Sequence, residues 1–237
     1  MNYNSMKKYS DSVENVLKKY ESFGSVIPPS FRKTIPHIFD FSKKNKKLIK
    51  IDLNDEKKFI KYIKDDIKQN GHIFGMGGYG ENRIIYRRSA LFKNDDNPRS
   101  IHLGVDLWMP KNTPIYCPMP AIVHSFQDNN NFGDYGPTII LKHTLNKIIF
   151  YTLYGHLSRT SLKKLKVGMK IKKGQRIATL GGYNENGQWP SHLHFQIISD
   201  LLNKKGDFPG VASIPQKKYY LTLCPDPNLI LRINRKK

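Results

Sequence analysis

The chain has 237 residues, of which 38% are hydrophobic and 25% charged, so a packed core is expected and global disorder is excluded. Lys and Arg number 40 against 19 Asp and Glu, which gives a net charge of +21. This excess implies attraction to polyanions such as nucleic acid, anionic lipid or an anionic cell-wall polymer. An AT-rich gene encodes many lysines throughout its length, and such a bias in base composition explains the positive charge equally well.

The two cysteines, Cys117 and Cys224, form no CxxC motif, so we expect two free thiols. No apolar run is long enough to span a membrane. The N-terminus has a basic beginning, but it lacks the apolar region and the small-residue cleavage site of a Sec signal peptide. The sequence therefore favours a cytoplasmic protein or one exported by a non-Sec route.

Residues 1–71 are predicted to form a helical N-terminal extension. Apolar side chains recur at helical spacing in residues 10–22 and again in residues 55–69. Asn54 is the predicted N-cap of the second helix, and Gly71 is its predicted stop.

Residues 72–200 are predicted to form a mainly β domain, an antiparallel β-sandwich or a partly open barrel. Short β-branched runs alternate with Gly- and Asn-rich turns, and no gap between them holds a helical pattern. The candidate strands are TPIYC, AIVHSF, PTIILKH, KIIFYTLYGHL, QRIATLG and HLHFQII. Residues 201–237 are rich in proline and are predicted to form an irregular segment packed on the β core.

Two histidines, His192 and His194, lie two residues apart in the stretch SHLHFQI. On a strand they share one face with Gln196 and lie about 6–7 Å apart, while Leu193 and Phe195 face the core. An HxH pair arises by chance in about one such sequence in four, so this motif alone is a weak signal.

A second motif, IHLGVDLWMP, contains His102 and Asp106, whose side chains are ordinary zinc ligands. Four residues of straight strand span about 13 Å, so we expect a bend at Gly104. Taken alone, a surface histidine and a turn aspartate explain this motif as well. A third motif, LYGHLS, places His156 at a predicted strand end, where it can project into a cleft or bond the backbone.

Together the three motifs indicate a catalytic zinc site, because such sites combine three protein ligands with one open position. His102, Asp106 and one histidine of the HxH pair can supply the ligands. The two remaining histidines are then free for proton transfer near neutral pH.

The motifs HLGVD, YGHL and HLHFQ, in this order and spacing, resemble those of the LytM/lysostaphin-type zinc metallopeptidases. The resemblance covers about residues 75–200. The stretch VGMKIKKGQRIATLG resembles the hairpin that this family shares with biotinyl- and lipoyl-carrier-like folds. The stretches GGYGENRIIYRRS and CPDPNLIL resemble a branch found as small stand-alone bacterial proteins.

The resemblance implies a LytM-type fold and a zinc-dependent endopeptidase that cleaves peptide bonds of peptidoglycan, in stem peptides or cross-bridges. It implies one zinc ion per chain, held by His102, Asp106 and His194. It also implies that His156 and His192 are the two catalytic histidines. All five residues are present, whereas degenerate family members have lost ligands and act as amidase activators.

Four further residues are candidates for substrate contact or for support of the ligands: Tyr79, Glu81, Arg83 and Gln196. The first three lie in the glycine-rich stretch GGYGENR, which fits a purely structural loop as well. Trp108 and Trp189 flank the metal motifs and are expected to line a groove or to pack in the core. The remaining histidines are predicted to be structural or to lack ligand-like spacing: His37, His72, His124 and His143.

Other functions remain open at this point. The same fold serves catalytically silent or regulatory wall-binding proteins, and the same chemistry serves delivered antibacterial toxins. Specific nucleic-acid binding is disfavoured, because the lysines are not interleaved with aromatic residues as in base-stacking surfaces. Anionic wall polymers are candidate partners because of the positive charge.

Overall fold

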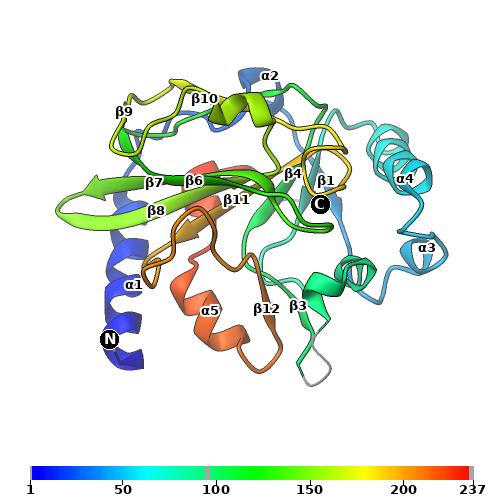
Figure 1. Ribbon diagram of the computed structural model, residues 1–237, viewed down its shortest axis with the longest axis horizontal. Helices are drawn as coiled ribbons and strands as arrows, with labels where there is room; N and C mark the ends of the chain where they lie inside the picture. The colour runs from blue at the N-terminus through cyan, green and yellow to red at the C-terminus, as the bar shows by residue number, and fades with distance from the viewer. Residues whose placement is uncertain (1, 94–96, 235–237) are drawn as a thin grey trace.

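The computed structural model describes residues 2–93 and 97–234, which are organised around one eight-stranded sheet (Figure 1). The strand order is β1-β2-β4-β11-β8-β7-β6-β9. All neighbours in it pair antiparallel except β1 and β2, which are parallel and make the sheet mixed. The prediction of a mainly β fold with an α-containing N-terminal extension is confirmed; the large sheet is mixed rather than purely antiparallel, and no closed barrel forms among the described residues. The strands of this sheet are β1 (His37–Phe39), β2 (Gly75–Gly77), β4 (Val105–Trp108), β6 (Ala121–Asn129), β7 (Gly136–Leu145), β8 (Ile148–Gly155), β9 (Lys170–Ile171) and β11 (His192–Ile198).

Shorter elements cover both faces of the sheet. Two further strand pairs join β5 (Pro114–Tyr116) to β10 (Arg176–Thr179) and β3 (Arg99–His102) to β12 (Val211–Ser213). Figure 1 places α1 and α5 on one side of the large sheet, and α2 with β10 on the other. The helices are α1 (Tyr3–Lys19), α2 (Pro29–Arg32), α3 (Lys46–Ile49), α4 (Glu56–Gln69), α5 (Lys217–Leu223) and α6 (Asn228–Leu231), with 3₁₀ turns η1 (Ile85–Arg88), η2 (Ala90–Phe92) and η3 (Arg159–Leu162).

The first helix starts earlier than the spacing of apolar residues predicts. The side chain of Asn2 accepts a hydrogen bond from the Ser5 backbone N–H at 2.9 Å, and this cap starts α1 at Tyr3 instead of residue 10. Val13 and Leu17 on its apolar face are fully buried in the main core. Because β1 also joins the large sheet, the described part of the N-terminal extension shares both core and sheet with the residues that follow it.

The second predicted helix is α4, and its limits agree with the sequence to within a residue. Its N-cap is Asp55, not Asn54, because the Asp55 carboxylate accepts from the Lys58 backbone N–H at 3.0 Å. Gly71 follows the helix end in the left-handed region, with φ of 73°.

The C-terminal segment is more ordered than predicted, since it contains β12, α5 and α6. Cys117 and Cys224 are buried free thiols, as expected. Among the described residues, no helix has the length and apolar character needed to cross a membrane.

Strand β11 has the alternation that its sequence predicts. Leu193, Phe195 and Ile197 are fully buried in the main core cluster. His192 and Gln196 belong to the other set of alternating side chains and are buried as well. The strand therefore offers polar groups to a site that lies inside the molecule.

Candidate metal centre

Three predicted ligand residues converge from β3, β4 and β11. His194 lies directly opposite Asp106 in the antiparallel pairing of β11 with β4. The Nε2 atom of His102 lies 3.0 Å from Nδ1 of His194, and each nitrogen lies 3.2 Å from Oδ1 of Asp106. Donors about 2.0–2.1 Å from a tetrahedral zinc ion are about 3.3 Å apart, so these three atoms fit one zinc ion. Within the described ranges, no other cluster of histidine, cysteine or carboxylate groups has such an arrangement.

Gly104 allows this convergence. It lies between the end of β3 and the start of β4, where a bend was expected. A Cβ atom at this position would lie 2.6 Å from Cε1 and Nε2 of His194 and 2.8 Å from the carbonyl oxygen of Phe195. A residue with a side chain would therefore displace the His194 ring from the centre.

Hydrogen bonds fix the tautomers of the two candidate ligand histidines, His102 and His194. Nδ1 of His102 donates to the carbonyl of Gly78 at 2.9 Å, which leaves the lone pair on Nε2. Nε2 of His194 donates to Oε1 of Gln196 at 2.9 Å, which leaves the lone pair on Nδ1. The amide of Gln196 is itself oriented, because its Nε2 donates to the carbonyl of Pro209 at 3.1 Å. Gln196 thus lies where a supporting role was predicted for it.

Arg83 binds the Asp106 carboxylate through the oxygen that does not face the two histidines. Its Nη1 donates to Oδ2 of Asp106 at 2.5 Å, and its Nε donates to Oε2 of Glu81 at 2.7 Å. The other oxygen of Glu81 accepts from the Phe41 backbone N–H at 2.8 Å. Burial alone would raise the pKa of Asp106, but the neighbouring His102 and Arg83 outweigh it and hold that pKa well below its usual range. Arg83 is only 1% exposed. Its position therefore favours the predicted role of supporting the Asp106 carboxylate over that of substrate contact.

Tyr79, in the same loop, has a different environment. Its hydroxyl donates to the carbonyl of Cys224 at 2.5 Å, and its ring packs against the main core. This contact attaches the glycine-rich loop to the C-terminal segment.

The other two predicted site histidines, His156 and His192, lie beside the triad with ring centroids 4.2 Å apart. Nδ1 of His192 donates to the carbonyl of Pro190 at 2.7 Å, and Nδ1 of His156 donates to that of Asn186 at 2.8 Å. Both rings therefore keep an unprotonated Nε2, and that of His192 lies 3.8 Å from Oδ1 of Asp106. Burial lowers the pKa of His192 to about 4, and burial with the neighbouring His192 lowers the pKa of His156 well below its usual value. Both imidazoles are thus neutral bases near pH 7.

The backbone of His156 is in the left-handed region, with φ of 62°. Its N–H donates to the carbonyl of Tyr135 at 2.8 Å, and its carbonyl accepts from Gly181 at 2.9 Å. A non-glycine residue held in this conformation by its surroundings is typical of functional sites.

Tyr135 belongs to the site but has no signal in the sequence, where NFGDYG reads as a turn. Its hydroxyl lies 3.4 Å from Nε2 of His194 and 3.5 Å from Oε1 of Gln196. A Cβ atom at Gly210 would lie 1.8 Å from this hydroxyl, and one at Gly155 would lie 2.6 Å from the ring. Two glycines thus make the space in which Tyr135 approaches His194.

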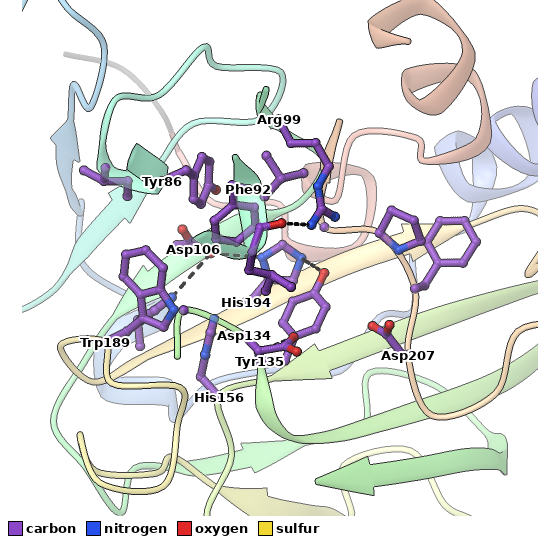
Figure 2. A pocket seen from close by; sticks show the side chains of 18 of the residues that line it. Tyr86, Phe92, Arg99, Asp106, Asp134, Tyr135, His156, Trp189, His194 and Asp207 are labelled. Atoms are coloured by element: carbon purple, nitrogen blue, oxygen red, sulfur yellow. Dashed lines mark hydrogen bonds and ion pairs between the residues drawn. The ribbon is translucent and has the colours of Figure 1, made fainter. Parts of the chain in front are cut away.

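A cavity of about 270 Å³ opens on the centre, and Asp106, His156, His192 and His194 all line it. Figure 2 shows Asp106, His194 and Tyr135 in the middle of the cleft, Trp189 and His156 at one side and Asp207 at the other. Trp108 and Trp189 both line the cavity and are both buried, so they are groove and core residues at once. An open side next to three donors is the arrangement of a catalytic rather than a structural zinc site.

Two of the remaining histidines bond to groups outside the candidate metal centre. His143 lies between the carbonyl of Pro120 at 3.1 Å and the hydroxyl of Thr152 at 2.7 Å. His37 pairs with Asp66 at 2.9 Å.

Comparison with known proteins agrees with this geometry. Residues 100–206 match the model of Peptidase family M23. The peptidoglycan DD-endopeptidase ShyC of Vibrio cholerae is 27% identical over 166 residues, which cover 65% of this chain and 35% of that protein. An uncharacterized metalloprotease of Haemophilus influenzae is 26% identical over 165 residues, which cover 66% of this chain and 32% of that protein. The chain thus spans about a third of the length of these curated relatives.

Among solved structures, the catalytic domain of the antimicrobial peptidase lysostaphin from Staphylococcus simulans is 27% identical to this chain. The match covers 50% of this chain and 80% of that domain, with a TM-score of 0.36.

Proposed function

Because the chain belongs to Peptidase family M23 through residues 100–206, we propose that it is a zinc-dependent metalloendopeptidase that hydrolyses peptide bonds of bacterial peptidoglycan. The bond lies in a stem peptide or a cross-bridge. ShyC, a relative by sequence, is a peptidoglycan DD-endopeptidase, which supports this substrate class. The net charge of +21 also favours contact with anionic wall polymers.

The observation that carries the proposal is the arrangement of five polar residues around one point. Three donor atoms lie 3.0–3.2 Å from one another, and two imidazoles with free Nε2 atoms lie next to them on the cavity wall. In this proposal His102, Asp106 and His194 hold one zinc ion, and His156 and His192 perform proton transfer.

The chemistry divides between the metal and the side chains. Zinc, when bound, polarises a carbonyl oxygen and lowers the pKa of a water molecule. Of His192 and His156, one accepts at Nε2 the proton that the attacking water loses, and the Nε2–H formed in this way stabilises the developing oxyanion or protonates the leaving amine. Because both rings donate Nδ1–H to fixed carbonyls, each presents Nε2 to the reaction without first changing tautomer.

Digestion of purified peptidoglycan tests the proposal. The zinc-loaded protein should release muropeptides whose masses report hydrolysis of a single type of peptide bond. A chelator should abolish the release, and added zinc should restore it. Binding of one zinc ion without new peptide termini, on walls of several cross-link types, would instead support a non-hydrolytic wall-binding protein.

A further inference from the structure

Trp108 lies flat against the imidazole of His192. The two residues face each other in the register of β4 and β11, with ring centroids 4.0 Å apart and planes inclined by 23°. Trp108 is 1% exposed, so this ring is a buried wall behind the histidine. The hydrogen bond from Nδ1 to Pro190 fixes one point of the imidazole, and the stack fixes its plane.

The far side of Trp108 is packed by aromatic residues of the N-terminal segment. Its ring centroid lies 6.0 Å from that of Phe39, 5.5 Å from that of Phe41 and 6.4 Å from that of Phe59. All three rings precede residues 100–206, and all are buried. These three rings therefore restrict tilting of the tryptophan away from His192.

The indole N–H group of Trp108 makes no hydrogen bond that would orient the ring. Nε1 of Trp108 is buried and has no hydrogen-bond partner, which is unfavourable for folding. The flat face is what contacts His192, and a phenylalanine offers such a face without a buried donor. Substitution of Trp108 by phenylalanine therefore separates the effect of ring stacking on His192 from the effect of the N–H group.

We propose that the N-terminal segment orients His192 for proton transfer through Trp108, which makes Trp108 a positioning residue for the reaction. Phe39, Phe41 and Phe59 press the indole against the imidazole, so that Nε2 stays directed at the point where His102, Asp106 and His194 would hold zinc. The inference rests on the proposed peptidase function and adds residues from outside the family match to its catalytic apparatus.

Two substitutions at Trp108 and one matched control test the proposal. Trp108→Leu should lower kcat about 10- to 100-fold, the cost of a misplaced catalytic group, with zinc content and KM changed less than about twofold. Trp108→Phe should retain kcat within about threefold, since it keeps an aromatic face. The control is Phe150→Leu, because Phe150 is equally buried and stacks on the structural His143 at 5.1 Å and 18°. It should lower stability without lowering kcat.

A substitution at Phe59 tests whether the packing around Trp108 affects His192. Phe59→Leu removes a ring that touches Trp108 but does not line the cavity. Phe59→Leu should lower kcat by less than Trp108→Leu does. As in that variant, KM and zinc content should be preserved. The visible spectrum of the Co²⁺-substituted variants should match that of the parent protein, since the ligand triad is unaltered.

Nuclear magnetic resonance detects the stacking of Trp108 on His192 independently of any peptidase activity. Protons above an indole face are shifted upfield, so the Cε1–H signal of His192 should move downfield in Trp108→Leu. If the parent protein cleaves no peptidoglycan while this shift is observed, the proposed function fails and the orientation of His192 stands. The inference is overturned if folded, zinc-loaded Trp108→Leu keeps kcat within about twofold, or if Trp108→Phe loses as much as Trp108→Leu.

Discussion

Arg83 and Asp106 form an ion pair in which both side chains are buried, and the pair divides the carboxylate between two tasks. Oδ2 accepts from the guanidinium at 2.5 Å, while Oδ1 faces the two ligand histidines at 3.2 Å each. The arginine thereby fixes the direction of the oxygen left for a metal. Glu81 and the Phe41 backbone N–H hold the arginine in turn.

Arg83→Gln should therefore weaken zinc binding about 10- to 100-fold, the usual cost of losing a partner behind a metal ligand. Competition with a chelating dye measures this affinity. Arg88→Gln is the matched control, because Arg88 is also buried but donates to the carbonyl of Gln188 instead of a ligand. Equal zinc affinity in the two variants would contradict a role of Arg83 in orienting Asp106.

The five site residues should divide into two classes when they are mutated. His194→Ala should lose both zinc and activity, because it removes one of the three donor atoms. His156→Ala should keep zinc within about twofold while kcat falls about 10²- to 10⁴-fold, the range for loss of a general acid or base. Metal analysis and kinetics on the same preparations separate the classes. Release of zinc by His156→Ala would show the ligand assignment to be wrong.

Gly104→Ala should abolish zinc binding even though it changes no ligand. The new methyl group would lie 2.6 Å from the His194 ring and 2.8 Å from the backbone of β11, so the ring has to move. Gly182→Ala is the control, since the nearest atom to its Cβ would be Cδ of Lys111 at 3.7 Å. Zinc titration of the two folded variants should give opposite results; retention of zinc in both would contradict the steric argument.

Gln196→Leu should weaken zinc binding about tenfold and lower stability, since it leaves the N–H of His194 and the carbonyl of Pro209 unpaired in the interior. Tyr135→Phe should change zinc affinity less than about threefold, because its hydroxyl contacts of 3.4 and 3.5 Å are long. Thermal unfolding and dye competition measure the two effects. A larger loss of zinc affinity in Tyr135→Phe than in Gln196→Leu would reverse this ranking.

Stability should depend on pH through His143, which is buried and does not line the cavity. Burial lowers its pKa from the ordinary 6.5 to about 4. Between these values the unfolded chain binds a proton that the folded chain does not, so stability is complete above pH 6.5 and is lost as the pH falls toward 4. The shift corresponds to about 3 kcal/mol. Denaturant unfolding at a series of pH values should show a shallower pH dependence in His143→Gln, and parallel curves would contradict the assignment.

The sequence predicts that His102, Asp106 and His194 lie close together, and short motifs carry this prediction. In the stretch His102–Asp106 the donor types and the glycine between them are adjacent in the chain, and the alternation around His194 defines its face by itself. The stretch around His102 and Asp106 is predicted to be extended with a bend at Gly104, and the choice of His194 over His192 as third ligand follows from the resemblance to LytM/lysostaphin-type peptidases. The limits of α1 and the N-cap of α4 were missed, because they depend on which single side chain reaches a backbone N–H.

The supporting contacts were not predictable to the same degree. Arg83 was a candidate, but its link through Glu81 to the Phe41 backbone joins segments 40 residues apart. The stack of Trp108 on His192 depends on the register of β4 with β11, which composition does not specify. Tyr135 reaches His194 from a loop that reads only as a turn. Such contacts depend on tertiary packing rather than on local pattern.

The parallel pair β1–β2 has a consequence for any shortened form of the protein. In the large sheet β2 lies between β1 and β4, and the latter carries Asp106. A chain that starts at residue 100, where the family match starts, would leave β4 as an edge strand with unpaired backbone groups. Edge strands fray and invite pairing with other molecules. Two three-residue strands thus shield the strand that carries Asp106 from edge-to-edge pairing, and a shortened form of the protein has to include them to keep that strand inside the sheet.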